Sequence, residues 1–232
     1  MSEPTNLFWY SSVAVQLLFC VHLLWSGLAR KHPIFTLYLG CAVVRSIAAF
    51  FFTAGYNGAL PLSYTYFWLC SEPVLLLLQI AVALEVHSGM WKEYASALRS
   101  ARSLVVVLLL AAILFAAIPL GPELRRDGAV QLHLVLHFEF LVKRYVSSVL
   151  ALFLSFSALT FLVVIRNSFK NEFLRHESML AAYFGLYAIA CLFVNMGWTR
   201  AVFVNNYLLS ALTVLLVVWM SVFRPGPELA RQ

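Results

Sequence analysis

Long apolar segments separated by short polar ones recur along the whole chain. A helix needs about 20 predominantly apolar residues to cross the hydrocarbon core of a bilayer. Open strand edges cannot be satisfied in lipid, so such segments are expected to be helices. By this measure the sequence predicts an all-α, seven-helix membrane bundle with spans at residues 7–29, 33–54, 64–86, 103–120, 141–165, 179–197 and 202–223.

Two stretches beside the predicted spans are less regular. Residues 92–101, KEYASALRSA, are compatible with a short helix lying on the inner membrane surface. Residues 130–140, VQLHLVLHFEF, alternate apolar and polar positions as a strand does. They also fit an outward extension of the fifth helix, which we prefer, although the sequence leaves both readings open.

Basic residues are distributed unevenly between the two sides. One side carries ten of them: Arg30, Lys31, Lys92, Arg99, Arg102, Arg166, Lys170, Arg175, Arg224 and Arg231. The other side carries Arg125, Arg126 and Arg200, and the depth of Lys143 and Arg144 stays open. Cytoplasmic loops are richer in Lys and Arg, so the N-terminus is predicted outside and the C-terminus in the cytoplasm.

Composition agrees with a membrane protein. Hydrophobic residues make up 62% of the chain and charged residues 11%, against about 45–50% and about 25% in soluble domains. No basic stripe interleaved with aromatic residues appears, so no nucleic-acid partner is predicted. Because the spans use most of the 232 residues, we expect one polytopic domain in the cell's cytoplasmic (inner) membrane and no soluble domain.

Two ionisable residues fall near the middle of neighbouring spans. Arg45 lies nine residues from the outer end of the second span and Glu72 eight residues from that of the third. At 1.5 Å per residue both are roughly 12 Å deep. A charge in the centre of a bilayer costs about 2.5–3.5 kcal/mol on insertion scales. An opposite charge at the same depth is the cheapest remedy, so we predict an ion pair between Arg45 and Glu72.

Other polar groups accompany this carboxylate along the third span. Pro73 follows it directly and predicts a bend, because proline lacks an N–H and clashes with the carbonyl four residues earlier. Gln79 is two helical turns further on and shares the same face. Glu85 is turned away from that face, near the cytoplasmic border, where we expect it to pair with Lys92 or Arg102.

Further spans are expected to bring polar groups to the outer half of the membrane. If their faces converge, they line a polar cavity open to the outside. The candidate ligand contacts are Arg45, Glu72, Gln79, Tyr38, Arg144, Asn195 and Asn206. A structural interpretation competes with this one. In it, the buried pair only fixes helix register, polar groups link helices, and the charged residues of 133–144, including a Glu139–Lys143 pair, lie solvated above the membrane.

No motif for catalysis or for a cofactor appears. The sequence lacks GxSxG, a P-loop and a GxGxxG in suitable surroundings, and the seventh span has no lysine for a retinal Schiff base. His133 and His137 have a spacing that metals use, but no third ligand accompanies them. We therefore predict no metal and no cofactor, and an intramembrane enzyme is the least favoured class.

The favoured hypothesis is a receptor-like protein that binds or senses a small ligand. Its output would pass to a cytoplasmic partner protein through residues 87–102 and 166–178. The first alternative is a small-molecule or proton-coupled transporter, because ionisable groups beside a broken helix are typical of transport sites. The second alternative is a structural or assembly subunit. In every case the lipid bilayer is the surrounding partner.

Overall fold

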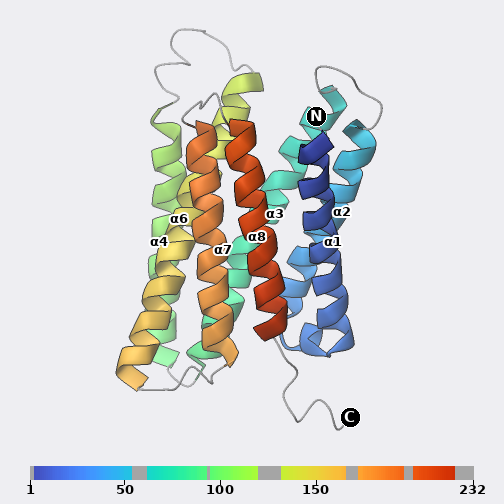
Figure 1. Cartoon of the computed structure of the whole chain (residues 1–232). Helices are drawn as coiled ribbons and strands as arrows, with labels where there is room; N and C mark the ends of the chain where they lie inside the picture. The colour runs from blue at the N-terminus through green and yellow to red at the C-terminus, as the bar shows by residue number, and fades with distance from the viewer. Residues whose placement is uncertain are drawn as a thin grey trace. The chain divides into compact units, whose positions relative to one another are not determined.

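The computed structural model describes residues 3–53, 62–92, 95–119, 132–165, 172–195 and 201–222. Within these ranges the chain is all-helical, with seven α-helices, one 3-10 turn and no strand (Figure 1). The elements are α1 (Glu3–Trp25), η1 (Leu28–Arg30), α2 (Pro33–Thr53), α3 (Leu62–Met90), α4 (Ala95–Ala117), α6 (Leu132–Ile165), α7 (Glu172–Asn195) and α8 (Ala201–Val222).

Five of these helices are long and apolar enough to cross a membrane. They cover Phe8–Trp25, Pro33–Phe52, Leu62–Met90, Leu134–Val163 and Phe173–Phe193. Two further apolar stretches, Ala101–Ala117 and Tyr207–Val222, are shorter among the residues described. Side chains on many of these helices are apolar and exposed, as acyl chains require and water does not tolerate. The chain therefore has the character of an integral membrane protein.

The two irregular stretches are both helical where the structure describes them. Residues 132–140 form the first turns of α6, so the helical extension is confirmed. Residues 95–101 form the start of α4, so a separate surface helix is wrong. Ala, Leu and Arg favour the helix there, and no Gly or Pro interrupts it.

The connections expected at 87–102 and 166–178 are shorter than the sequence suggested. The helix α3 continues to Met90, α4 begins at Ala95 and α7 begins at Glu172. Apolar length alone underestimates such helices, because their last turns carry polar residues beyond the apolar part. The helix α3 also continues through Pro73.

The chain divides into two compact units, and the first comprises Met1–Glu85 and Leu209–Gln232. Its core includes three buried aromatic rings from α1, α2 and α8. Phe35 stacks on Trp219 with ring centroids 4.8 Å apart, and Phe19 meets both rings edge-on. Gly27, with φ 73°, precedes η1; this left-handed conformation suits glycine and lets the chain reverse between α1 and α2.

The second unit comprises Val86–Leu208, and in it α6 packs against both α4 and α7. Its core includes Met90, Trp91, Ala158, Phe161 and Leu174, contributed by the end of α3, by α6 and by α7. Gly89 is a close-packing point, because a Cβ atom there would overlap the Phe173 ring. Small residues of this kind let membrane helices approach closely.

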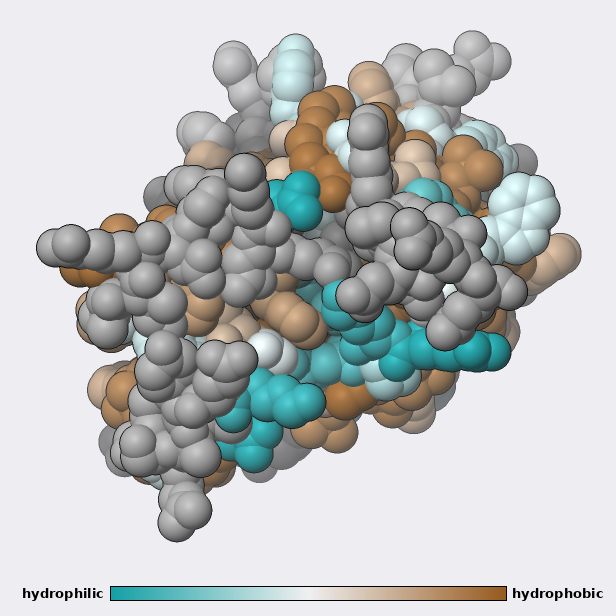
Figure 2. Space-filling view, turned by 90° about the horizontal axis from the view of Figure 1, so that it is seen from below, coloured by the Kyte–Doolittle hydropathy of each residue, from teal (hydrophilic) through white to brown (hydrophobic). Residues whose placement is uncertain are grey.

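One end of the helices presents hydrophilic groups. Figure 2 shows hydrophilic groups beside hydrophobic ones at the end where α1 ends and α2 begins. Arg30, Lys31 and Lys92 are exposed, and all three belong to the side that the basic-residue count predicts to be cytoplasmic.

Candidate functional site

The structure contains the ion pair that equal depth predicts. Arg45 Nη2 on α2 pairs with Glu72 Oε2 on α3. The Arg45 guanidinium also lies over the Trp68 ring, 3.8 Å from its centroid, which favours a cation through the ring's quadrupole. Both side chains are largely withdrawn from the surface, with 14% of Arg45 and 4% of Glu72 exposed. Losing either partner would leave a buried, uncompensated charge.

A second polar contact joins the same two helices, nearer to the start of α2 than the ion pair. Gln79 Nε2 donates a hydrogen bond of 3.1 Å to Tyr38 Oη, and both residues are buried. Gln79 follows Glu72 by seven residues, and Tyr38 precedes Arg45 by seven. Two helical turns on each helix therefore separate the contacts, which is the register of antiparallel neighbours. Gln79 and Tyr38 thus belong to the contact between α2 and α3.

A third contact between α2 and α3 lies where α2 begins. Together with Arg45–Glu72 and Tyr38–Gln79 it forms a row of contacts along the two helices, called the contact line below. Glu85 accepts hydrogen bonds from the backbone N–H groups of Ile34 and Phe35, each at 3.0 Å. The first N–H groups of a helix have no partner inside the helix, and the helix dipole favours a negative charge beside them. Glu85 therefore caps α2.

This capping role corrects the expected pairing of Glu85 with Lys92 or Arg102. Lys92 is exposed, and Arg102 donates a hydrogen bond of 2.6 Å to Ser88 Oγ. The sequence held two signals for the cap. Pro33 opens α2 without a Ser, Thr, Asp or Asn before it, and the antiparallel register set by the Arg45–Glu72 pair brings Glu85 opposite that helix start.

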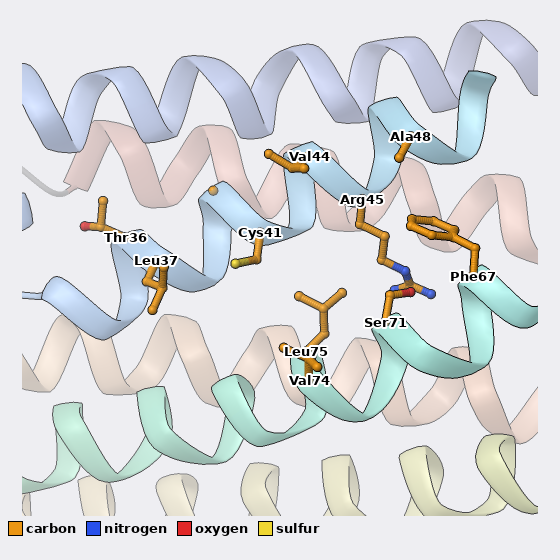
Figure 3. A pocket seen from close by; sticks show the side chains of 11 residues that line it. Thr36, Leu37, Cys41, Val44, Arg45, Ala48, Phe67, Ser71, Val74 and Leu75 are labelled. Atoms are coloured by element: carbon orange, nitrogen blue, oxygen red, sulfur yellow. The ribbon is translucent and has the colours of Figure 1, made fainter. Parts of the chain in front are cut away.

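A groove of about 620 Å³ runs beside this contact line, between α2 and α3 (Figure 3). Its lining consists of Thr36, Leu37, Gly40, Cys41, Val44, Arg45 and Ala48 on α2, and Phe67, Ser71, Val74 and Leu75 on α3. The α2 residues run from Thr36 to Ala48, which is thirteen positions and about 18 Å along the helix. The sequence predicts a polar cavity around Arg45, whereas the groove that Arg45 lines is mainly apolar.

Several apolar side chains of the groove lining are exposed. The exposed fractions of Leu37, Val44 and Val74 are 56%, 67% and 54%. These residues lie along the helices rather than at their ends, so the groove opens sideways. In a bilayer this opening would face acyl chains.

Arg45 supplies the strong hydrogen-bond donor of the groove. Thr36 donates to the carbonyl of His32, just before α2, and Ser71 donates to the carbonyl of Trp68 on its own helix. The Arg45 Nε atom is buried and has no hydrogen-bond partner among the described residues, and the close-up shows the guanidinium reaching toward Ser71 and Phe67 (Figure 3). Among the described residues this N–H is thus an unsatisfied donor on a side chain that lines the groove.

The remaining candidate residues lie on α6, α7 and α8. Arg144 is partly buried, with its guanidinium carbon 5.3 Å from the centre of the Tyr145 ring. His137 lies on the described part of α6. The side chains of His133, Asn195 and Asn206 fall outside the described residues. Convergence of these groups on the Arg45–Glu72 pair stays a prediction.

The charged pair on α6 departs from the solvated interpretation. Lys143 Nζ lies 3.3 Å from Glu139 Oε1, as their spacing of four residues predicts. The Lys143 side chain is only 2% exposed, so the expectation of a solvated lysine is wrong. Its aliphatic stem and its paired charge are both covered by protein.

Pro73, the predicted site of a bend in α3, is exposed.

Comparison with known proteins gives no match among family models, curated proteins or solved structures. The interpretation of the site therefore rests on its geometry.

Replacing Glu85 by alanine is expected to destabilise the start of α2. The two N–H groups of Ile34 and Phe35 would lose their acceptor, which costs about 1–2 kcal/mol for a helix cap. Unfolding in mixed micelles would measure this loss, and amide hydrogen exchange at the two residues should become faster. Lys92→Ala is the control, because a Glu85–Lys92 ion pair would make both substitutions equally costly. Equal losses would contradict the capping role.

Proposed function

We propose that the chain is a seven-span protein of the cell's cytoplasmic membrane that binds a small amphiphilic ligand and signals to a cytoplasmic partner. The five helices able to cross a membrane and the two shorter apolar ones support the number of spans. The excess of basic residues on one side supports an external N-terminus and a cytoplasmic C-terminus. This orientation places the Glu85 cap near the inner surface.

The observation that carries the ligand proposal is a buried cation in the wall of an apolar groove. Arg45 lines a groove whose other walls are mainly apolar, and its Nε–H has no partner among the described residues. An amphiphile with one hydrocarbon chain and an oxygen acceptor matches both properties. Its hydrocarbon chain would take the place of lipid acyl chains against the groove wall. Its oxygen would accept a hydrogen bond from Arg45. A strongly polar solute would lose its hydration without compensation.

The three α2–α3 contacts suggest how binding would reach the cytoplasm. A ligand carboxylate or carbonyl would compete with Glu72 for the guanidinium and weaken the ion pair. Because Tyr38–Gln79 and the Glu85 cap follow in register along the same helices, a shift of α2 along α3 would disturb the cap. The exposed Arg30 and Lys31 lie just before α2. The ligand then selects between two arrangements of one helix pair.

A filled-groove variant tests the ligand proposal. A Cβ atom at Gly40 would meet nothing within 4 Å, so Gly40→Leu is expected to occupy the groove while keeping the Arg45–Glu72 pair. Gly185→Leu on α7 is the matched control, because Gly185 also has open space and lies outside the groove lining. The probe is a photoactivatable long-chain fatty acid in lipid vesicles, with labelled residues mapped by mass spectrometry.

We expect the wild type and Gly185→Leu to be labelled on the α2 and α3 groove residues, and Gly40→Leu to lose at least tenfold of that labelling. Equal labelling of wild type and Gly40→Leu would contradict the proposed site. Native mass spectrometry of the purified wild type should show a bound amphiphile, and its acyl chemistry would name the natural ligand.

The proposed topology has its own test. An odd number of spans puts the two termini on opposite faces of the membrane. We expect a fluorescent protein fused to the C-terminus to fluoresce in the cytoplasm, and an N-terminal epitope to be stained on intact cells. Finding both termini on one face would contradict the seven-span topology without bearing on the groove.

A further inference from the structure

A second set of polar residues is buried in the unit Val86–Leu208, outside the groove lining. It joins the end of α3 to α6 and α7. His87 Nδ1 lies 2.9 Å from Ser157 Oγ, and Trp91 Nε1 donates to the same oxygen at 2.9 Å. Glu177 Oε1 lies 3.7 Å from His87 Nδ1. His87, Ser157 and Glu177 are 2%, 5% and 0% exposed, so bulk water does not form hydrogen bonds with their polar atoms.

Glu177 differs from the other glutamates whose surroundings are described. Glu72 has Arg45, Glu85 has two backbone N–H donors, and Glu139 has Lys143. Neither oxygen of Glu177 has a hydrogen-bond partner among the described residues. Its ionisable neighbour there, His87, has its Nδ1 atom 3.7 Å from Glu177 Oε1, farther than a hydrogen bond reaches. The side-chain donors near Glu177 are His87 and Ser157. A buried carboxylate without a well-formed hydrogen bond or a fixed cation is destabilised, which favours the protonated acid.

The role of Ser157 toward His87 depends on the tautomer of the imidazole. An indole N–H only donates, so Ser157 Oγ accepts from Trp91 Nε1. A hydroxyl has a second lone pair, so in the 2.9 Å contact with His87 Nδ1 it donates only when that nitrogen carries no proton. In that tautomer the imidazole is neutral and carries its proton on Nε2. A charged Glu177 would then give the buried cluster a net negative charge, whereas a protonated Glu177 keeps it neutral.

We propose that His87, Ser157 and Glu177 form a buried proton-binding site, in which Glu177 holds one proton and His87 is the base that accepts it. Transfer breaks the Glu177 O–H bond and forms an N–H bond at His87 Nδ1. The Ser157 hydroxyl turns its proton from Nδ1 toward the new carboxylate. The product is an ion pair with the same net charge, so the transfer needs no other reactant.

Other ionisable groups on the same elements complete the surroundings. Arg102 on α4 donates to Ser88, Lys92 is exposed, and Arg175 and His176 precede Glu177 on α7. The charged residues described on α6, Glu139, Lys143 and Arg144, lie more than ten residues before Ser157. Among the described residues, the ion-pair partner of Glu177 is His87. We therefore expect the proton of Glu177 to exchange through His87, its described ion-pair partner.

Infrared spectroscopy of the full chain in lipid vesicles tests the proton on Glu177. At neutral pH we expect a carboxylic-acid C=O band that disappears in Glu177→Gln. Glu85→Gln is the matched control and should keep the band, because Glu85 accepts two N–H bonds as a carboxylate. If Glu177→Gln does not accumulate, ¹³C labelling of glutamate in the wild type should shift the same band. The absence of an acid band, or its survival in Glu177→Gln, would overturn the proposal.

The role of His87 needs a kinetic measurement. On transfer to D₂O the acid band shifts as its proton exchanges, and the rate of this shift reports proton delivery. We expect His87→Gln to keep the band, because Glu177 stays protonated, but to slow the exchange at least tenfold. Unchanged exchange would show that His87 does not carry the proton. A purely structural cluster would change stability without changing this rate.

Discussion

A buried cation and a buried anion on adjacent helices constrain how α2 and α3 lie against each other. Arg45 and Glu72 each carry a charge that the interior cannot solvate, and each compensates the other. The pair is satisfied in one register only, because sliding either helix by one turn would separate the charges by about 5 Å. That register also brings Gln79 to Tyr38 and Glu85 to the start of α2.

The same pair explains the character of the groove. Gly40, Cys41 and Ala48 are small and leave space beside α3, while Arg45 extends across that space. Its charge is neutralised by Glu72 and covered by Trp68. The groove is therefore apolar despite containing an arginine, and it suits a molecule that is itself mainly hydrocarbon.

The two polar sites handle buried charge in different ways. Among the described residues of the first unit, Glu72 pairs with a cation and Glu85 accepts from two backbone N–H groups, so both have fixed partners. In the second unit the described partner of Glu177 is an imidazole, that of His87, rather than a lysine, an arginine or a helix start. A fixed pair sets geometry, whereas a neutral acid beside a base can move a proton. Ligand binding and proton binding would thus use separate groups of the same chain.

Features that depend on spacing along the chain could be predicted from the sequence. Apolar segment length predicted the helices, and equal depth predicted the Arg45–Glu72 pair. The Glu85 cap was missed because its partners are backbone atoms about fifty residues away. The His87–Ser157–Glu177 cluster was missed for a related reason. Its members lie seventy and twenty residues apart, and only the packing of three helices brings them together.

A double-mutant cycle on Arg45 and Glu72 tests most directly whether this pair sets the register of α2 and α3. The account predicts that Arg45→Ala and Glu72→Ala each lower the free energy of unfolding by about 3–5 kcal/mol, because each leaves an unpaired buried charge. The double variant should recover much of that loss, since neither charge remains. Strictly additive losses, or a negligible effect of either single substitution, would contradict it.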